Sequence, residues 1–350
     1  MITWGMVGNS HDASLAVFET KVAGLTSNKK TKLLWASLAK DFTGLPNNPD
    51  FAEAQLKTAI ESFGSPSKIV WYERPFLKTL RQWRAGQGWL YAENNIKEYL
   101  KRWDITCPIQ YTQHHLSHAA YAYYTQPHDD CAVICIDSIG EFETLTIWHG
   151  KDNKLKKIHS QGYPHSLGLF YSAMTQRCGL VPQRDEYMMA QLAANGNYKR
   201  FSKMMLNEIV TPPHRTAKIS MRENLHRGCN WWRPELTSEQ DIADIAAATQ
   251  RIFELSLKHL SKWAKKETGS ANLALAGGGA LNRQAVDLIS RKWKNVHVPH
   301  NPGDPGSCIG AVLAQTKTKV TLDKQWYKAC LLYTSPSPRD LSTSRMPSSA

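Results

Sequence analysis

The sequence predicts an α/β protein folded into two lobes, approximately residues 1–160 and 161–328. Short apolar runs of strand length alternate with longer segments in which apolar residues recur at helical spacing. A chain of 350 residues is long enough for two lobes with separate cores. In each half, expected strands lead into turns rich in Gly, Asn, Ser and Asp, and such turns hold phosphate groups when they face a common cleft.

The first lobe is expected to open as a β-meander. Its short apolar runs have the length and composition of strands, and residues 51–63 between them have the spacing of a helix. Arg74 and Pro75 end the fourth of these runs, and the last three runs are expected to pair as neighbouring antiparallel strands. The expected strands are residues 2–7, 14–19, 32–39, 68–73, 108–112, 131–137, 143–149 and 154–159.

The second lobe is expected to be richer in helices. A long helix over 238–267 would begin at Ser238, whose hydroxyl can cap the first turn, and Glu239 would lie near the positive end of the helix dipole. A strand at 272–276 runs directly into three glycines. The remaining helices are expected at 166–178, 186–194, 198–210, 280–291 and 306–316, with a further strand at 295–299.

The composition is that of an ordinary globular protein, with 42% hydrophobic and 21% charged residues. No apolar run approaches the roughly 20 residues of a membrane helix, and the start of the chain lacks a signal peptide pattern, so a cytoplasmic location is expected. The seven cysteines are dispersed without a Cys-x-x-Cys pair, which favours reduced and mostly buried thiols.

The net charge of +13 allows two interpretations, a nucleic-acid partner or a solvated basic surface with a site for anionic ligands. The basic residues are scattered and form no stripe interleaved with aromatic residues. The second interpretation is therefore preferred, and nucleic acid is not expected to be the main partner.

The chain changes character at about residue 329. Residues 329–350 are rich in Ser and Pro and have no apolar period, which predicts a disordered tail. A second interpretation is that this stretch is translated sequencing-adapter sequence in place of the natural end of the protein. Residues from 329 on are therefore left out of the fold prediction.

A histidine pair is the most informative local pattern. His114 and His118 are four residues apart, so on a helix both imidazoles lie on one face and can bind one metal ion. Asp137, at the end of a buried apolar strand, is a natural third ligand. A mixed set of histidine and carboxylate with open positions is typical of Fe(II), and zinc is the alternative. A spacing of four residues between two histidines also occurs by chance. His115 would point about 100° away from His114 on the helix and is a less suitable ligand.

Two further segments have features of a ligand site. Residues 8–14 form a turn in which His11 could act as a general base, although an Asx-type turn with an exposed histidine explains the same residues. The turn Gly277-Gly278-Gly279 stands between a strand and a helix and can bring backbone N–H groups close to a nucleotide. A tight strand-to-helix turn is the plainer interpretation of these glycines.

Asp304 lies in a third such segment, between the last expected strand and the last expected helix. It could cap that helix, or it could complete the metal site as a fourth ligand from the second lobe. The sequence does not separate these two roles.

Taken together and in order, these segments resemble the carbamoyltransferases of the NodU/CmcH and TobZ type. The resemblance covers approximately residues 2–316 and rests on the order of the motifs more than on any one of them. The matching stretches are Gly8 to Ser14, Trp71 to Pro75, Gln113 to Ala120, Asp137 to Glu141, Tyr163 to Gly168, Glu186-Tyr187, Gly277 to Asn282 and Asp304 to Ala311.

The resemblance implies the two-lobed fold of actin, Hsp70 and sugar kinases (the ASKHA fold), with nucleotide and metal in the cleft between the lobes. The resemblance also implies a metal ion, expected to be iron, that is bound by four side chains. It further implies a histidine beside the transferred carbamoyl group. By position, the implied metal ligands are His114, His118, Asp137 and Asp304, the implied catalytic residue is His11, and the implied nucleotide contacts are Ser138, Gly140, Gly277, Gly278, Gly279 and Asn282.

The activity implied by the family is transfer of a carbamoyl group to an acceptor hydroxyl. Such proteins make carbamoyl-adenylate from carbamoyl phosphate and ATP in a second, YrdC-like domain, which is expected to be missing from this chain. The sequence departs from the family pattern at two places that concern ligand binding. At most Lys40 remains of the basic run that follows the third strand in the family, and Gln191 stands where the family has a glycine. The alternatives are a tRNA threonylcarbamoyladenosine-type transferase of the same fold and a non-catalytic ATP-binding module.

Overall fold

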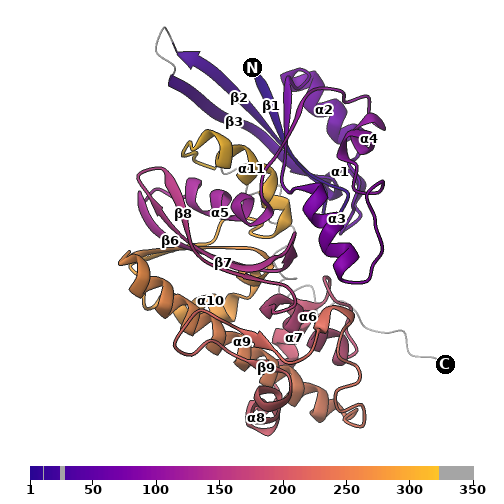
Figure 1. Cartoon of the computed structure of the whole chain (residues 1–350), viewed down its shortest axis with the longest axis vertical. Helices are drawn as coiled ribbons and strands as arrows, with labels where there is room; N and C mark the ends of the chain where they lie inside the picture. Colours follow the sequence, from indigo (N-terminus) through magenta and orange to yellow (C-terminus); the bar gives the residue numbers. More distant parts are fainter. Residues whose placement is uncertain (11, 24–27, 323–350) are drawn as a thin grey trace, which may run out of the picture.

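Two five-stranded mixed sheets form the centre of the molecule, in a computed structural model that describes residues 1–10, 12–23 and 28–322 (Figure 1). In each sheet the central strand pairs antiparallel with the strand that follows it in the chain. On its other side the central strand pairs parallel with a strand from later in the chain. The first sheet has the order β3 (Asn28–Leu38), β2 (Ser14–Ala23), β1 (Ile2–Val7), β4 (Lys68–Trp71) and β5 (Ile109–Tyr111).

The second sheet repeats the topology of the first. Its first strand again lies in the middle, and the next two strands along the chain again form the meander. The order is β12 (Asn295–His297), β11 (Asn272–Ala276), β6 (Asp130–Gly140), β7 (Glu143–Lys151) and β8 (Lys154–Gly162). A separate two-stranded ribbon pairs β9 (Val210–Thr211) with β10 (Ser220–Met221).

Helices cover the sheets in two groups. Beside the first sheet lie α1 (Lys40–Thr43), α2 (Glu53–Phe63), α3 (Pro75–Arg84) and α4 (Ile96–Lys101). Beside the second sheet lie α6 (Leu167–Arg177), α7 (Glu186–Ala193), α8 (Tyr198–Glu208), α9 (Glu239–Thr268) and α10 (Arg283–Ser290). Between the sheets lie α5 (His114–Tyr124) and α11 (Ser307–Thr316), which pack on each other (Figure 1).

The mixed α/β fold and most elements agree with the expectations. The long helix begins at Ser238 in a capping box with Asp241, so the expected cap is confirmed. Three short helices, α1, α3 and α4, and the ribbon β9–β10 were not expected from the sequence. The expected lobe boundary near residue 160 does not match the division between the sheets, because the hairpin β7–β8 pairs with β6 in the second sheet. The tail at 329–350 lies outside the described residues.

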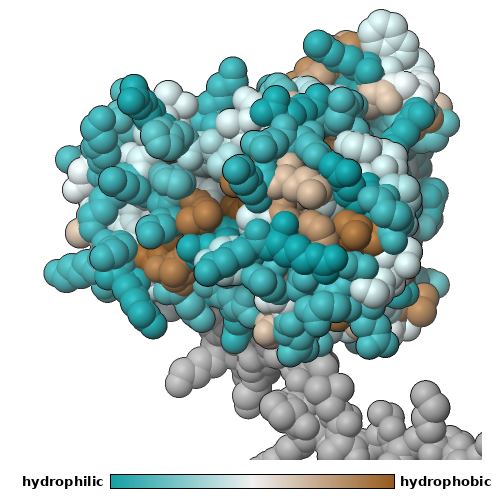
Figure 2. Space-filling model, turned by 90° about the horizontal axis from the view of Figure 1, so that it is seen from below, coloured by the Kyte–Doolittle hydropathy of each residue, from teal (hydrophilic) through white to brown (hydrophobic). Residues whose placement is uncertain are grey.

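One face of the molecule is predominantly polar. Figure 2 shows a largely hydrophilic face on which hydrophobic residues form separate patches. Among the described residues, no helix has both the length and the apolar character needed to cross a membrane. The six cysteines of the described part, which excludes Cys330, are free thiols, as the dispersed spacing indicates.

Close backbone contacts fix α11 between β1 and α5. A Cβ atom on Gly5 of β1 would lie 1.8 Å from the carbonyl oxygen of Cys308, and one on Gly310 would lie 1.9 Å from the carbonyl oxygen of Ser117. Only hydrogen fits at these two positions. Since Asp304 begins the three-residue turn that leads into α11, the docking of this helix also determines where the Asp304 carboxylate lies.

Gly5→Ala is therefore expected to destabilise the fold. The added methyl group would force β1 and α11 apart, and overpacking of this kind costs about 1–3 kcal/mol or more. Urea unfolding would measure the loss. Gly303→Ala is the matched control, because its Cβ would meet no atom closer than 3.8 Å. Equal free energies of unfolding for the two variants would contradict the role given to Gly5.

Candidate metal centre and nucleotide turn

The histidine pair opens α5, as the spacing predicts. His114 is the first residue of the helix and His118 lies one turn later, so both side chains project from the same face. Both are buried, with exposed fractions of 2% and 0%. Their Nε2 atoms face each other at 3.0 Å.

Two carboxylates from other elements close the cluster. Asp137 lies on β6 where the pairing with β7 shifts between Ile136 and Gly140, so its side chain leaves the regular ladder. Asp304 begins the short 3₁₀ turn η3 (Asp304–Gly306) before α11. From His114 Nε2, the distances are 3.1 Å to the Asp137 carboxylate and 3.3 Å to that of Asp304.

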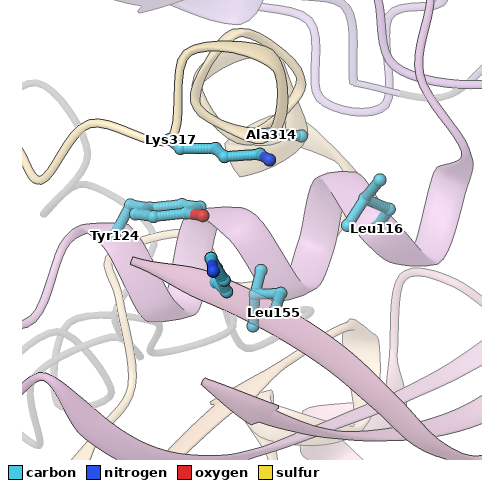
Figure 3. Close-up of a pocket in the computed structure, with 6 residues that line it drawn as sticks. Leu116, Tyr124, Leu155, Ala314 and Lys317 are labelled. Atoms are coloured by element: carbon cyan, nitrogen blue, oxygen red, sulfur yellow. The ribbon is translucent and has the colours of Figure 1, made fainter. Parts of the chain in front are cut away.

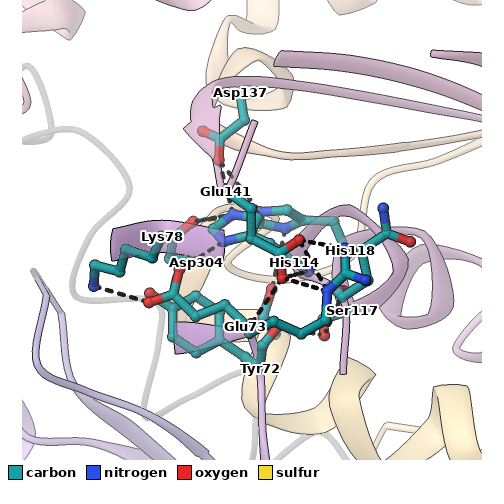
Figure 4. Close-up of polar contacts among 12 residues, drawn as sticks. Tyr72, Glu73, Lys78, His114, Ser117, His118, Asp137, Glu141 and Asp304 are labelled. Carbon is teal, nitrogen blue, oxygen red and sulfur yellow. Dashed lines mark hydrogen bonds and ion pairs between the residues drawn. The ribbon is translucent and has the colours of Figure 1, made fainter. Parts of the chain in front are cut away.

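The second histidine meets the same two carboxylates. His118 Nε2 lies 3.5 Å from Asp137 and 3.3 Å from Asp304. One ligand atom from each of the four residues therefore falls within 4.8 Å of the others. Figure 4 shows Asp137 on one side of the imidazoles and Glu73 on the other. The structure thus brings together all four side chains that the sequence indicated as metal ligands.

The geometry of this cluster fits a divalent cation. With bonds of about 2.1 Å, neighbouring ligand atoms lie about 3.0 Å apart in an octahedron and about 3.4 Å apart in a tetrahedron. The hydrogen-bond and ion-pair distances among the four groups run from 3.0 to 3.5 Å. Two imidazole nitrogens and two carboxylate oxygens suit iron, zinc or manganese and do not by themselves choose among them.

Electrostatics in the cluster favours positive charge. Burial alone lowers the pKa of His114, but the carboxylates of Asp304 and Asp137 outweigh it and hold that pKa well above its ordinary value. Burial would raise the pKa of Asp304, and the neighbouring His114 instead holds it well below the usual range. A bound cation would supply the same positive charge and leave the imidazoles neutral, as metal ligation requires.

Polar residues outside the ligand set contact both histidines. Glu73 follows β4 and places a carboxylate oxygen 3.5 Å from His114 Nδ1, while its other oxygen accepts a hydrogen bond of 2.8 Å from Lys78. Burial raises the pKa of Glu73, but Lys78 and His114 outweigh it and lower that pKa to about 2. On the other histidine, His118 Nδ1 lies 3.2 Å from the hydroxyl of Ser307.

Glu141 ties the start of α5 to the end of β4. Its carboxylate accepts hydrogen bonds from the backbone N–H of Arg74 at 2.7 Å and, at 3.4 Å, from that of His114. The Arg74 guanidinium also donates to it at 2.6 Å. Glu73 and Glu141 received no role from the sequence alone. The available signal was their position inside a matched motif, within two residues of the end of a strand.

The glycine turn packs against the strand that carries Asp137. Gly277 has φ +81°, and a Cβ on it would lie 2.2 Å from the Ile136 carbonyl oxygen, while one on Gly279 would lie 2.8 Å from the Ile136 side chain. These two glycines are explained by strand-to-helix packing. Gly278 is different, because a Cβ there would meet only the Asp137 carboxylate, at 3.5 Å. The turn therefore borders the metal cluster and leaves Gly278 facing it.

Three other expected nucleotide contacts have structural partners of their own. The Asn282 side chain caps α10 by accepting from Ala285 N–H at 3.1 Å, and its amide pairs with Gln250. The Ser138 carbonyl accepts from the Ser166 hydroxyl at 2.7 Å. A Cβ on Gly140 would lie 2.2 Å from the His114 ring. Gly140 is thus needed for the position of His114.

The turn between β1 and β2 lies beside the cluster. His11 itself is outside the described residues. Near it in sequence, the Ser14 hydroxyl donates to the carbonyl of Pro305 at 2.8 Å, next to Asp304. Lys78 donates to the carbonyl of Asn9 at 3.3 Å. The turn therefore contacts both the segment that carries Asp304 and the lysine that holds Glu73.

Two surface cavities lie apart from this cluster. One, of about 310 Å³, opens between α5, β8 and α11 (Figure 3). The other, of about 320 Å³, is formed by Glu208 and residues 231–235. The four clustered residues line neither of them. The lining residues of the first are Leu116, Tyr124, Lys154, Leu155, Ala314 and Lys317.

Comparison with known proteins gives one family match. Residues 50–313 match the family model described as carbamoyltransferase N-terminus. An uncharacterised protein of Synechocystis, sll1178, is 33% identical over 69% of this chain and 42% of its own length. Nodulation protein NolNO of Sinorhizobium fredii is 25% identical over 59% of this chain and 31% of its own length. The chain thus spans less than half of either relative.

Among solved structures, HypF of T. kodakarensis superposes with a TM-score of 0.47 at 14% identity. The superposition covers 90% of this chain and 47% of that protein.

Proposed function

The chain belongs to the carbamoyltransferase N-terminus family, and on that premise we propose that it carries out the transfer step of an O-carbamoyltransferase. The donor is carbamoyl-adenylate, formed from carbamoyl phosphate and ATP by a YrdC-like domain or partner. The acceptor is a hydroxyl group of a small molecule or glycan. The observation that carries the proposal is the buried cluster of two histidines and two aspartates beside a glycine turn.

The proposal includes the fold and the cofactor. Two sheets of one topology, with α5 and α11 between them, support two lobes of the ASKHA type with the ligands in the cleft. The proposed metal is Fe(II), with Zn(II) as the alternative, and the four ligand atoms suit either ion. The four ligands would be His114, His118, Asp137 and Asp304. A bound cation supplies Lewis-acid chemistry, which polarises an acyl or phosphate oxygen.

The residues of the chain have separate tasks in this proposal. Gly278, on the open side of its turn, lets backbone N–H groups approach the adenylate phosphate. The acceptor oxygen attacks the carbamoyl carbon, the bond from that carbon to the phosphate oxygen breaks, and AMP leaves with the electron pair. His11 takes the proton of the acceptor hydroxyl. The outcome is one carbamoyl ester and one AMP for each adenylate consumed.

Removal of the proposed base is expected to slow transfer and leave ligand binding intact. In His11→Ala, transfer from preformed carbamoyl-adenylate should fall by about 100-fold or more, the usual contribution of a positioned base. Single-turnover assays over a range of pH would measure it, with bound metal as the control. Near-normal transfer by the variant would exclude His11 as the base.

The glycine turn gives a matched pair of variants. Gly278→Ala is expected to fold normally and to weaken adenylate binding by about 10-fold, because its methyl group would face the site and only the Asp137 carboxylate. Gly277→Ala is expected to destabilise the protein, because φ +81° and the Ile136 carbonyl both oppose a side chain. Calorimetric titration with a non-hydrolysable adenylate analogue and urea unfolding distinguish the two effects.

The proposed function as a whole is tested by supplying preformed carbamoyl-adenylate to the metal-loaded protein. AMP release faster than in buffer, and faster again with hydroxyl-bearing acceptors, is the expected result. Asp304→Asn should remove the acceleration. Failure of the metal-loaded protein both to bind the adenylate analogue and to release AMP would overturn the proposal.

A further inference from the structure

We infer that Glu73, held by Lys78, is a positioning residue that fixes the orientation and tautomer of His114. The inference rests on the metal centre proposed above and names a residue outside the ligand set. Glu73 does not face the clustered ligand atoms. It lies on the opposite side of the His114 ring, toward Nδ1, whereas both aspartates lie toward Nε2 (Figure 4).

The local contacts direct one carboxylate oxygen of Glu73 toward His114. Its side chain is buried, with 5% exposed, and one oxygen is taken by Lys78 at 2.8 Å. The other oxygen lies 3.5 Å from His114 Nδ1, which is a buried nitrogen without a hydrogen bond of ordinary length. A small rotation of the imidazole would close this gap to a normal hydrogen bond. Nδ1 would then donate its proton to Glu73, and the Nε2 lone pair would point to the metal.

The two histidines are held differently. His118 Nδ1 faces the Ser307 hydroxyl at 3.2 Å, a neutral partner, while His114 Nδ1 faces a carboxylate. A carboxylate increases the basicity of a ligating imidazole and fixes its ring more strongly than a hydroxyl does. Loss of Glu73 should therefore weaken metal binding more than loss of the Ser307 hydroxyl.

Lys78 makes the arrangement rigid. Its ammonium also donates to the Asn9 carbonyl in the β1–β2 turn, so one side chain connects that turn to Glu73 and thereby to His114. Lys78 lies on α3 and Glu73 follows β4, so both belong to elements beside the first sheet, whereas His114 begins α5. Glu73 thus approaches its histidine on the side away from the two aspartates.

The experiment measures binding of Co(II) alone, by equilibrium dialysis and by the visible ligand-field spectrum. Glu73→Ala and the double variant Glu73→Gln/Lys78→Met are compared with Ser307→Ala. The double variant avoids leaving Lys78 buried without its carboxylate. Asp244→Asn is the matched control, because Asp244 is also a buried carboxylate paired with a cation, Arg200, but lies away from the cluster.

The expected result is Co(II) affinity about 10- to 100-fold weaker in both Glu73 variants, with an altered ligand-field spectrum. Ser307→Ala should lose less, and Asp244→Asn should lose stability only. Long-range ¹H–¹⁵N spectra of the zinc-loaded protein should show Nδ1–H on His114, and Glu73→Ala should bring that proton into faster exchange. Wild-type affinity and spectrum in folded Glu73 variants would overturn the inference. Absence of Co(II) and zinc binding in the unmodified protein would overturn the metal centre itself.

Discussion

His118→Ala is expected to abolish metal binding and, with it, carbamoyl transfer. The substitution removes one of four ligands and leaves Asp137 and Asp304 facing each other with one imidazole between them. Since loss of an outer-shell partner alone weakens binding about 10- to 100-fold, loss of a ligand should exceed about 100-fold. Elemental analysis after anaerobic loading with Fe(II), and separately with Zn(II), would measure the bound metal.

His115→Ala is the matched control for this experiment. His115 is also fully buried on α5, but its Nδ1 lies 3.0 Å from the Thr146 hydroxyl and its ring centroid lies 6.0 Å from that of His118. Burial holds the pKa of His115 well below its ordinary value, so it stays neutral. This variant should lose some stability and keep its metal. Metal retained by His118→Ala, or lost equally in both variants, would contradict the ligand assignment.

The histidine pair could be predicted because its evidence is local. A spacing of four residues on a helix places two side chains on one face whatever the rest of the chain does. Asp137 and Asp304 were reached by a different argument, from strand ends and motif order. Their approach to the pair depends on the pairing shift in β6 and on the docking of α11 against β1. Neither feature has a local sequence signal.

The lobe boundary shows the same limit of local evidence. The sequence pattern predicts three neighbouring strands at 131–137, 143–149 and 154–159, and the structure confirms their pairing. Strand pattern does not say which sheet a strand joins, and these three strands join the sheet that also contains β11 and β12. The deciding contact is the parallel pairing of β6 with β11, far along the chain.

Glycines were the hardest residues to interpret from the sequence. A glycine signals that a side chain would collide with something, but the sequence does not say whether that is a ligand or the protein itself. Gly277 and Gly279 avoid Ile136, whereas Gly278 has open space apart from the Asp137 carboxylate. The nucleotide contact is therefore proposed for Gly278, and a packing role explains its two neighbours.

Gly140→Ala should weaken the metal centre without replacing any of its four ligand residues. The new Cβ would lie 2.2 Å from Cδ2 and 2.6 Å from Cγ of His114, so the ring must move or the strand must open. Gly140 is followed by Glu141, which accepts a hydrogen bond from the N–H of His114, so moving the strand also disturbs the start of α5. Metal affinity should fall by about 10- to 100-fold, comparable to the loss of an outer-shell contact.

The same variant separates two roles for Gly140. If the glycine were there to admit a nucleotide, its replacement would weaken adenylate binding and leave Co(II) affinity and spectrum unchanged. If Gly140 instead makes room for the His114 ring, its replacement weakens Co(II) binding directly. Adenylate binding then weakens only to the extent that it depends on the bound metal. Gly278→Ala is the control with the opposite expectation, since its Cβ meets no histidine. A metal site unaffected by Gly140→Ala in a folded protein would exclude the packing role, because an imidazole ring and a methyl carbon cannot share a contact of 2.2 Å.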